Sequence, residues 1–109
     1  MGAMIAHPER SEIQLEGVLH ALSDPVRLRI VRELAAAEGE RPCGSFEHAV
    51  TKSTMTHHFK VLREAGVIRQ RQEATLRLTS LRREDLDARF PGLLARILEA
   101  AEEEAGVAV

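Results

Sequence analysis

Residues 51–66, TKSTMTHHFKVLREAG, decide the fold of this chain. Thr51 is a suitable N-cap, because its hydroxyl can accept a hydrogen bond from a free backbone N–H of the first helical turn. Gly66 stands where many helices end in a left-handed residue. Between them, apolar side chains recur at helical spacing: Met55, His58 or Phe59, and Leu62. The stretch therefore predicts one amphipathic helix.

The outward face of this predicted helix carries hydroxyls and cations but no acid. It consists of Lys52, Ser53, Thr54, Thr56, His57, Lys60 and Arg63. A helix with small donors and cations in its first turn suits the major groove of DNA. The alternative is an ordinary solvated face that happens to be basic.

The composition is that of one small globular domain. The chain has 109 residues, 44% of them hydrophobic, and with three Phe and no Trp or Tyr its core is expected to be aliphatic. It has no apolar run of the roughly 18 residues that span a membrane, and its start lacks the apolar segment of a signal peptide. A single Cys excludes an intramolecular disulfide and fits a reducing compartment.

The basic residues are concentrated around the predicted helix, although the whole chain has a formal net charge of −2. Residues 51–83 contain eight basic and two acidic residues, a net charge of +6. Residues 1–50 contain five basic and eight acidic residues, and residues 84–109 contain two basic and seven acidic ones. Such a separation indicates one surface that meets phosphate, with acidic ends facing elsewhere.

Two helices are predicted before this region. The first runs over 11–22, with an apolar face made of Leu15, Val18, Leu19 and Leu22. The second begins at Asp24-Pro25, since Asp24 can cap it and Pro at the first helical position loses no hydrogen bond. Its inward residues are expected to be Val26, Ile30, Val31 and Leu34, and its mostly outward residues Arg27, Arg29 and Arg32. Residues 1–10 lack periodicity and are expected to form a disordered tail before one domain over 11–105.

A short helix over 46–50 is predicted directly before the helix at 51–66, with Ser45 as its cap and Phe46 and Ala49 inward. Two helices joined by a tight turn form a helix-turn-helix. After Gly66 the period changes, and 67–72 and 75–79 predict two strands of a hairpin around Glu73-Ala74. Since neither central residue is Gly or Asn, the turn is expected to be longer than two residues or poorly ordered.

The hairpin is basic, with Arg69, Arg71 and Arg77 at alternate positions, so it predicts a wing that lies against DNA. A helical turn over 84–89 and a last helix from about 90 to 105 follow. That helix has a broad apolar stripe that includes Leu93, Leu94, Ile97 and Leu98. With Leu15 and Leu19 of the first helix, this stripe predicts a homodimer seam. The alternative is that the last helix only closes the core of one chain.

Two segments carry a resemblance to a known family. They are residues 22–31, LSDPVRLRIV, and residues 53–68, STMTHHFKVLREAGVI. The chain resembles the ArsR-type winged helix-turn-helix transcriptional regulators over about 13–100. The resemblance implies a mainly α fold with a small β-hairpin wing (α+β), and a cytoplasmic prokaryotic homodimer that binds operator DNA, mostly as a repressor. It also implies a dimer interface built from the first and last helices.

Carried over by position, the resemblance implies that Lys52, Ser53, Thr54, Thr56 and His57 face the groove. Lys60 and Arg63 would lie nearer the DNA backbone, and the three wing arginines would contact DNA as well. His58 matches a position that is mainly structural. For His57 the alternative is a plain exposed histidine.

Metal-dependent and catalytic functions find little support. One metal site of the family needs paired cysteines in the helix before the recognition helix, and this chain offers Cys43 alone. Another needs His with Asp or Glu ligands in the last helix, which here has no His. A Cys43, His48, His57 and His58 set would not converge, because neighbours on a helix point about 100° apart. Cys43 is expected to be a small packing residue; the alternative is a redox-sensing thiol, favoured by nearby Arg41.

No phosphate-binding loop, nucleophile elbow or H-E-x-x-H motif is present, and Asp85 and Asp87 diverge. We therefore predict no metal, no cofactor and no enzymatic activity. The predicted function is sequence-specific DNA binding by a homodimeric regulator, a repressor acting on an inverted repeat. The alternative from another class is a winged-helix module for protein–protein contact without specific DNA binding. The sequence indicates no effector.

Overall fold

The computed structural model describes residues 5–37, 39–46 and 50–107. Its elements in chain order are a 3₁₀ turn Arg10–Glu12, α1 Leu15–Leu22, α2 Pro25–Ala36, β1 Arg41–Pro42, a 3₁₀ turn Cys43–Ser45, α3 Lys52–Glu64, β2 Ile68–Glu73, β3 Leu76–Leu81, α4 Arg83–Arg89 and α5 Leu93–Val107. The described residues thus confirm a mainly α fold with a β-hairpin wing. None of these helices is long and apolar enough to cross a lipid bilayer.

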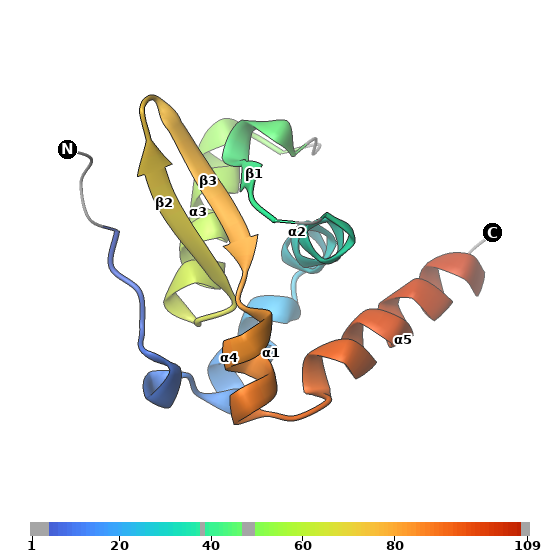
Figure 1. The fold of residues 1–109 in the computed structure, drawn as a ribbon. Coiled ribbons are helices and arrows are strands. Elements are labelled where there is room, and N and C mark those ends of the chain that lie inside the picture. Colours follow the sequence, from blue (N-terminus) through green and yellow to red (C-terminus); the bar gives the residue numbers. More distant parts are fainter. Residues whose placement is uncertain (1–4, 38, 47–49, 108–109) are drawn as a thin grey trace.

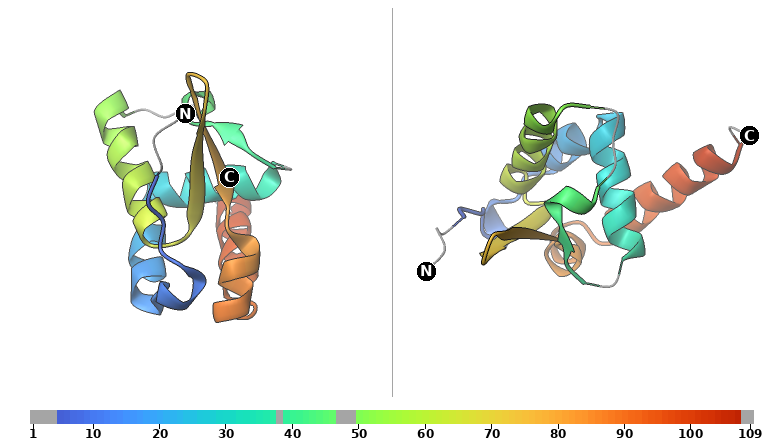
Figure 2. Two further views of the ribbon diagram at one scale, coloured as in Figure 1. Left: turned by 60° about the vertical axis from the view of Figure 1, so that its left-hand side comes forward. Right: turned by 90° about the horizontal axis from the view of Figure 1, so that it is seen from above.

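The helices surround one core, and the wing stands beside the helix predicted at 51–66. Figure 1 shows the hairpin of β2 and β3 next to α3, with α1 and α4 at the base of the hairpin. Helix α5 leaves the body and extends away from it, as the view from above shows most clearly (Figure 2). The fully buried side chains include Ile30, Leu34, Leu62 and Ile68, so α2, α3 and β2 share the core.

The sheet is antiparallel with strand order β1-β3-β2. Glu73 pairs with Leu76, so the hairpin loop is only the two residues Ala74 and Thr75, and the prediction of a longer turn is wrong. Ala74 takes a positive φ of 54°, which costs a non-glycine residue about 1–2 kcal/mol. The pairing along the two strands offsets this cost. Strand β1 was not predicted; a two-residue edge strand that contains a Pro leaves no periodic signal.

The first helix begins at Leu15 and not at residue 11. Ile13 has an extended backbone and its side chain is 1% exposed. It packs against Gly66, where a Cβ atom would lie 2.6 Å from Ile13 Cγ1. The chain therefore leaves the helical path so that Ile13 can fill the space over this glycine, which also ends α3 with a φ of 85°.

The buried face of α1 is also rotated from the predicted one. Val18, Ala21 and Leu22 are buried, whereas Leu15 and Leu19 are 43% and 46% exposed. The prediction placed Leu15, Val18, Leu19 and Leu22 on one apolar face and assigned Leu15 and Leu19 to a dimer seam. Only half of that face is covered by the rest of the chain.

The short helix predicted over 46–50 is not seen where the structure can test it. Phe46 has an extended backbone with φ −88° and ψ 126°, and Ser45 Oγ donates to Pro42 O instead of capping a helix. Residues 47–49, including Ala49, lie outside the described residues. Phe46 is nevertheless buried as predicted, with its ring edge-on to Phe59 at 5.4 Å between centroids.

Residues 1–4 of the predicted N-terminal tail lie outside the described residues, and residues 5–9 run beside the wing. His7 Nε2 accepts a hydrogen bond from the backbone N–H of Gln70 at 2.9 Å. Arg82 Nη1 donates to Pro8 O at 2.8 Å. This segment therefore contacts the free edge of β2 and the start of α4.

Helix α2 is capped as predicted. The Asp24 side chain accepts from the backbone N–H groups of Val26 and Arg27, and Pro25 occupies the first turn. Burial opposes the charged form of Asp24, but these hydrogen bonds and nearby positive charge outweigh it, so the pKa of this carboxyl lies below its ordinary value.

Asp24→Ala should lower the free energy of unfolding by about 1 kcal/mol, the usual cost of losing an N-cap. Because the pKa of Asp24 is lowered in the folded state, this contribution is complete above its ordinary value of 3.8 and is lost as the pH falls below that value. Urea denaturation at pH 7 and at pH 3 measures both. Asp24→Asn is the control, since Asn caps about as well; an equal loss in both variants at pH 7 would show that capping is not the cause.

Candidate nucleic-acid interface

Helix α3 presents its first half to solvent. Thr51 caps it by accepting from the backbone N–H of Thr54, and its hydroxyl also lies within hydrogen-bond distance of the Ser53 and Thr54 hydroxyls. Thr56 Oγ1 donates to the carbonyl of Lys52. The hydroxyls of the first turns are thus held in place by the helix itself, and the side chains that carry them are exposed.

Most of the predicted contact residues of α3 are exposed together: Lys52, Ser53, Thr54, Thr56, His57 and Lys60. No acidic residue belongs to the first turn of α3. Arg63 differs, because it is partly buried and its Nη1 donates to Gln70 Oε1 at 2.7 Å. It therefore ties α3 to β2 as well as adding charge to this side of the helix.

His58 lies on the packing side of α3, as predicted, and is 7% exposed. Its Nδ1 lies 3.3 Å from Arg27 Nη1 and 4.0 Å from Asp24 Oδ1. Since a guanidinium only donates, Nδ1 of His58 is the acceptor in this contact. His57 beside it is exposed, so the two histidines point to different surroundings.

Arg27 was predicted outward, and this is wrong. It is 7% exposed, and its guanidinium donates to the carbonyls of Ala21 at 2.7 Å and His20 at 3.2 Å at the end of α1. With the contact to His58, one buried side chain joins α1, α2 and α3. Arg27 thus adds a charged donor to two carbonyls at the end of α1, of which His20 O also accepts from Ser23.

The wing places its arginines on two different faces. Gln70 pairs with Thr79 and Gln72 with Arg77, so Arg77 shares the face of the buried Gln70. Side chains alternate along a strand, so Arg69 and Arg71 belong to the opposite face. The three predicted wing contacts are therefore not one group.

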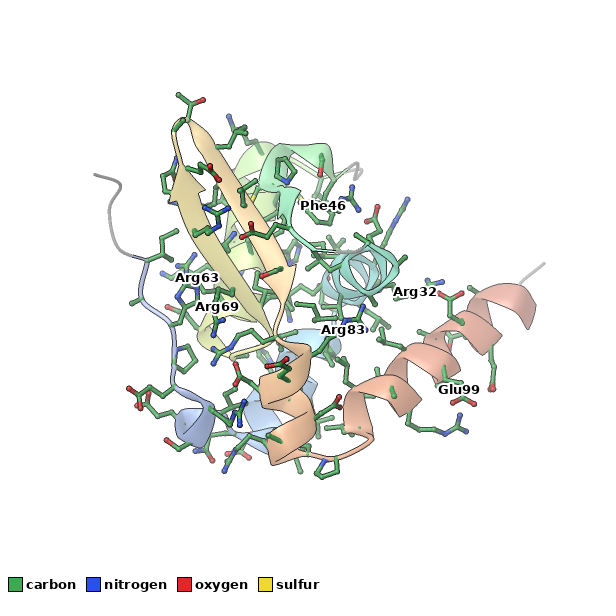
Figure 3. All side chains as sticks on the ribbon, viewed as in Figure 1. Arg32, Phe46, Arg63, Arg69, Arg83 and Glu99 are labelled. Carbon is green, nitrogen blue, oxygen red and sulfur yellow. The ribbon has the colours of Figure 1, made fainter. Side chains whose placement is uncertain are left out.

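The arginines of this opposite face already have acidic partners. Arg71 makes two hydrogen bonds to Glu40, at 2.7 and 2.8 Å, and an ion pair with Glu73 at 2.8 Å. The hydrogen bonds from Arg71 lower the pKa of the Glu40 carboxyl. Arg69 lies near the start of β2 above α4 (Figure 3), 3.5 Å from Asp85. Glu40 follows a loop glycine, and no sequence signal identified it.

Asp85 belongs to an ion-pair cluster and not to a carboxylate pair. It accepts hydrogen bonds from Arg10 and Arg82, and the one from Arg10 is the main cause that lowers its pKa.

Cys43 is half-buried, with its Sγ 3.1 Å from both Thr79 Oγ1 and Gln70 Nε2. Within the described ranges, no three His, Cys, Asp or Glu side chains are arranged to hold a metal ion.

The predicted dimer residues differ in their exposure within the single chain. Leu15 and Leu19 of α1 are exposed, and Leu93, Ile97 and Leu98 of α5 are half-buried. Leu94 is 5% exposed, because it already packs in the chain's own core. An apolar crevice joins these helices, lined by Val18, Leu22, Leu86, Phe90, Leu93, Leu94 and Ile97. Farther along, Arg32 of α2 points to α5 (Figure 3) and donates to Glu102.

Comparisons with known proteins agree with this architecture. A family described as a helix-turn-helix domain matches residues 22–71. An uncharacterized HTH-type transcriptional regulator of Bacillus subtilis (strain 168), YceK, is 37% identical over 79 residues, which cover 71% of this chain and 79% of that protein.

Solved structures show the same fold. An ArsR family transcriptional regulator superposes with a TM-score of 0.63 at 23% identity, covering 81% of this chain and 96% of that one. The transcriptional repressor BigR from Xylella fastidiosa gives a TM-score of 0.56 at 27% identity, covering 70% of this chain and 85% of that one. These relatives are transcriptional regulators, and they confirm the prediction of a regulator and not an enzyme.

Proposed function

We propose that this chain, which belongs to the ArsR-type winged helix-turn-helix transcriptional regulators, binds operator DNA as a cytoplasmic homodimer and represses transcription. The observation that carries the proposal is the exposed first half of α3, which has no acid in its first turn and lies beside a basic wing. A repressor is favoured over an activator by the resemblance to BigR, which is a transcriptional repressor.

In this proposal one group of interface residues contacts the bases and the other contacts the phosphates. The exposed side chains of the first turns, Lys52, Ser53, Thr54, Thr56 and His57, read base edges in the major groove. Lys60 and Arg63 and the wing arginines, Arg69, Arg71 and Arg77, contact phosphate. Phosphate contacts position the protein and supply most of the affinity, whereas base contacts supply the sequence preference.

The proposed dimer uses the apolar surface of α1 and α5. Leu15 and Leu19 are large apolar side chains left exposed on α1, and the same helix lines the apolar crevice against α5 with Val18 and Leu22. Leu93, Ile97 and Leu98 complete the seam, while Leu94 supports it from the core. Two copies would then present two α3 helices to half-sites about one helical turn, roughly 34–36 Å, apart on an inverted repeat.

Because some residues are assigned to phosphate and others to bases, two different responses to substitution are expected. Lys60→Ala should weaken binding to all duplexes alike and reduce the salt dependence by about one phosphate contact. Ser53→Ala should instead change which base is preferred at one position of the half-site, by about 1–3 kcal/mol. Affinities for a set of single-base variants of the bound duplex, measured at two salt concentrations, separate these effects. If both variants respond in the same way, the assignment of contacts is wrong.

The repressor role is tested by transcription from a promoter that carries the bound fragment. Adding the purified protein should lower the transcript level, and the Lys60→Ala variant should lower it less. A rise in transcript level would identify an activator. The competing function, a protein–protein module, predicts that no duplex comigrates with the protein in size-exclusion chromatography.

A further inference from the structure

A cleft of about 160 Å³ lies between α3 and the inner face of the wing. Its polar lining comes from both elements: Thr56, Lys60 and Arg63 from α3, Gln70 and Arg77 from the hairpin, and Cys43 from the turn after β1. One water molecule takes about 30 Å³ in the liquid, so the cleft has room for a group of several heavy atoms. Figure 2 shows α3 and the hairpin standing side by side.

In the part of the chain that the structure describes, the cations around this cleft lack the acidic partners that the arginines on the opposite face of the wing have. Lys60, Arg63 and Arg77 are all cations, and none of the described residues that line the cleft is an acid. Among the described residues no ion pair involves any of these three, whereas Arg69 and Arg71 on the opposite face are paired with Asp85, Glu40 and Glu73. The uncompensated positive charge of the wing therefore faces α3.

The cleft is also held in shape before anything binds. Gln70 is 2% exposed, and its amide is fixed on both sides. Its Oε1 accepts from Arg63 Nη1, and its Nε2 donates to Cys43 Sγ and Thr79 Oγ1. Arg63 Nε is buried without an acceptor among the described residues, and its Nη1 is taken by Gln70, so the guanidinium is fixed in position. Preorganised donors of this kind favour an oxyanion.

We propose that this cleft is a binding site for one tetrahedral oxyanion, held mainly by Arg77 and Lys60 and completed by Arg63. The inference rests on the proposed function, in which the ligand is a phosphate of the DNA backbone next to the groove that α3 occupies. Free inorganic phosphate has the same chemistry. Arg77 is then the principal wing contact, and Arg69 and Arg71 contribute less, because acids already compensate their charge.

The first test is the salt dependence of binding to one bound duplex. Arg77→Gln should reduce the slope of log K against log salt by about 0.9, the value for one phosphate contact, and should lower the affinity for specific and random duplexes by a similar factor. Arg71→Gln should change the slope clearly less. Arg29→Gln, which removes one exposed charge from α2, should leave the slope unchanged. An equal or larger change in Arg71→Gln than in Arg77→Gln would overturn the proposal.

The second test uses Cys43, the single cysteine of the chain, as a reporter inside the cleft. Its rate of alkylation by N-ethylmaleimide is followed by mass spectrometry with duplex, with inorganic phosphate, and with chloride of equal ionic strength. Slower alkylation with the duplex, and less slowing in Arg77→Gln, supports a backbone phosphate. Slowing by phosphate but not by chloride shows that the free anion also enters.

The two tests separate this inference from the proposed function. If no duplex binds at all, the proposed function fails. The alkylation of Cys43 in the presence of inorganic phosphate still tests whether the cleft binds an oxyanion. If a duplex binds but neither duplex nor phosphate slows the alkylation of Cys43, and Arg77→Gln keeps the original slope, the oxyanion site is refuted and the regulator remains.

Discussion

Leu19→Glu should lower the affinity for a complete inverted repeat by about 10²–10⁴-fold, because it separates the two copies of the chain. Leu19 is 46% exposed in the single chain, so the substitution should change the stability of one subunit by less than about 0.5 kcal/mol. In the proposed dimer the same position lies in an apolar seam, where an unpaired carboxylate is costly. A dimer holds its second reading helix at high effective concentration over the second half-site, and a monomer loses that advantage.

The control for this prediction is the half-site. Binding of Leu19→Glu to a duplex with one half-site should match that of the parent protein, which shows that α3 and the wing are intact. Sedimentation should give a monomer for the variant and a dimer for the parent. Unchanged affinity for the complete repeat, or an equal loss on the half-site, would contradict a dimer seam on α1.

Arg27→Met should lower the free energy of unfolding by about 3 kcal/mol. Met keeps most of the apolar volume of the side chain but removes its donors, and the buried carbonyl of Ala21 then loses its charged partner. Hydrogen bonds to charged groups contribute about 1.5–3 kcal/mol each, and Arg27 also contacts His20 O and His58 Nδ1. Chemical denaturation monitored by circular dichroism measures the difference.

Arg29→Met is the matched control for this substitution. Arg29 lies two residues further along α2, and its side chain is 63% exposed. Removing its charge should change the stability by less than about 0.5 kcal/mol. If the two variants were equally stable, the buried contacts of Arg27 would contribute nothing measurable, and the link between α1, α2 and α3 would have to come from apolar packing alone.

Arg27 and His58 show where sequence patterns succeed and where they stop. The position of His58 follows from helical periodicity within α3, and the structure confirms that it packs inward. Arg27 occupies a similar inward position on α2, but its charge suggested an outward one. Its burial depends on carbonyl groups at the end of another helix, and no pattern within α2 reports those. A buried arginine is rare because it needs such partners.

The charge partners of the wing could not be predicted from local sequence patterns either. Alternation along β2 and β3 predicted the hairpin, and it also implied alternating faces. The pairing register decides which arginines share a face, and the register depends on the loop at Ala74-Thr75, whose two-residue form the sequence did not favour. Glu40 reaches Arg71 only because β1 adds to the sheet edge, where Arg41 pairs with Thr79. The charge partners of the wing are therefore tertiary features.

The start of the first helix was predicted wrongly for a related reason. The apolar pattern over 11–22 fits a continuous helix, but Ile13 gains more by filling the space over Gly66 than by staying helical. Leu15 and Leu19 share the apolar pattern of the core residues although the single chain leaves them exposed. Periodicity records apolar surface and does not say whether the same chain or a second copy covers it.

Sequence-specific DNA binding is tested most directly by competition between genomic fragments and random duplex for the purified protein in gel shifts at several salt concentrations. A sequence-specific regulator should retain at least one fragment about 10³-fold or more over random duplex near physiological salt. Its affinity for both should fall steeply as salt rises, since phosphate contacts act on either. No preference for any genomic fragment over random duplex, at every salt concentration, would contradict sequence-specific DNA binding.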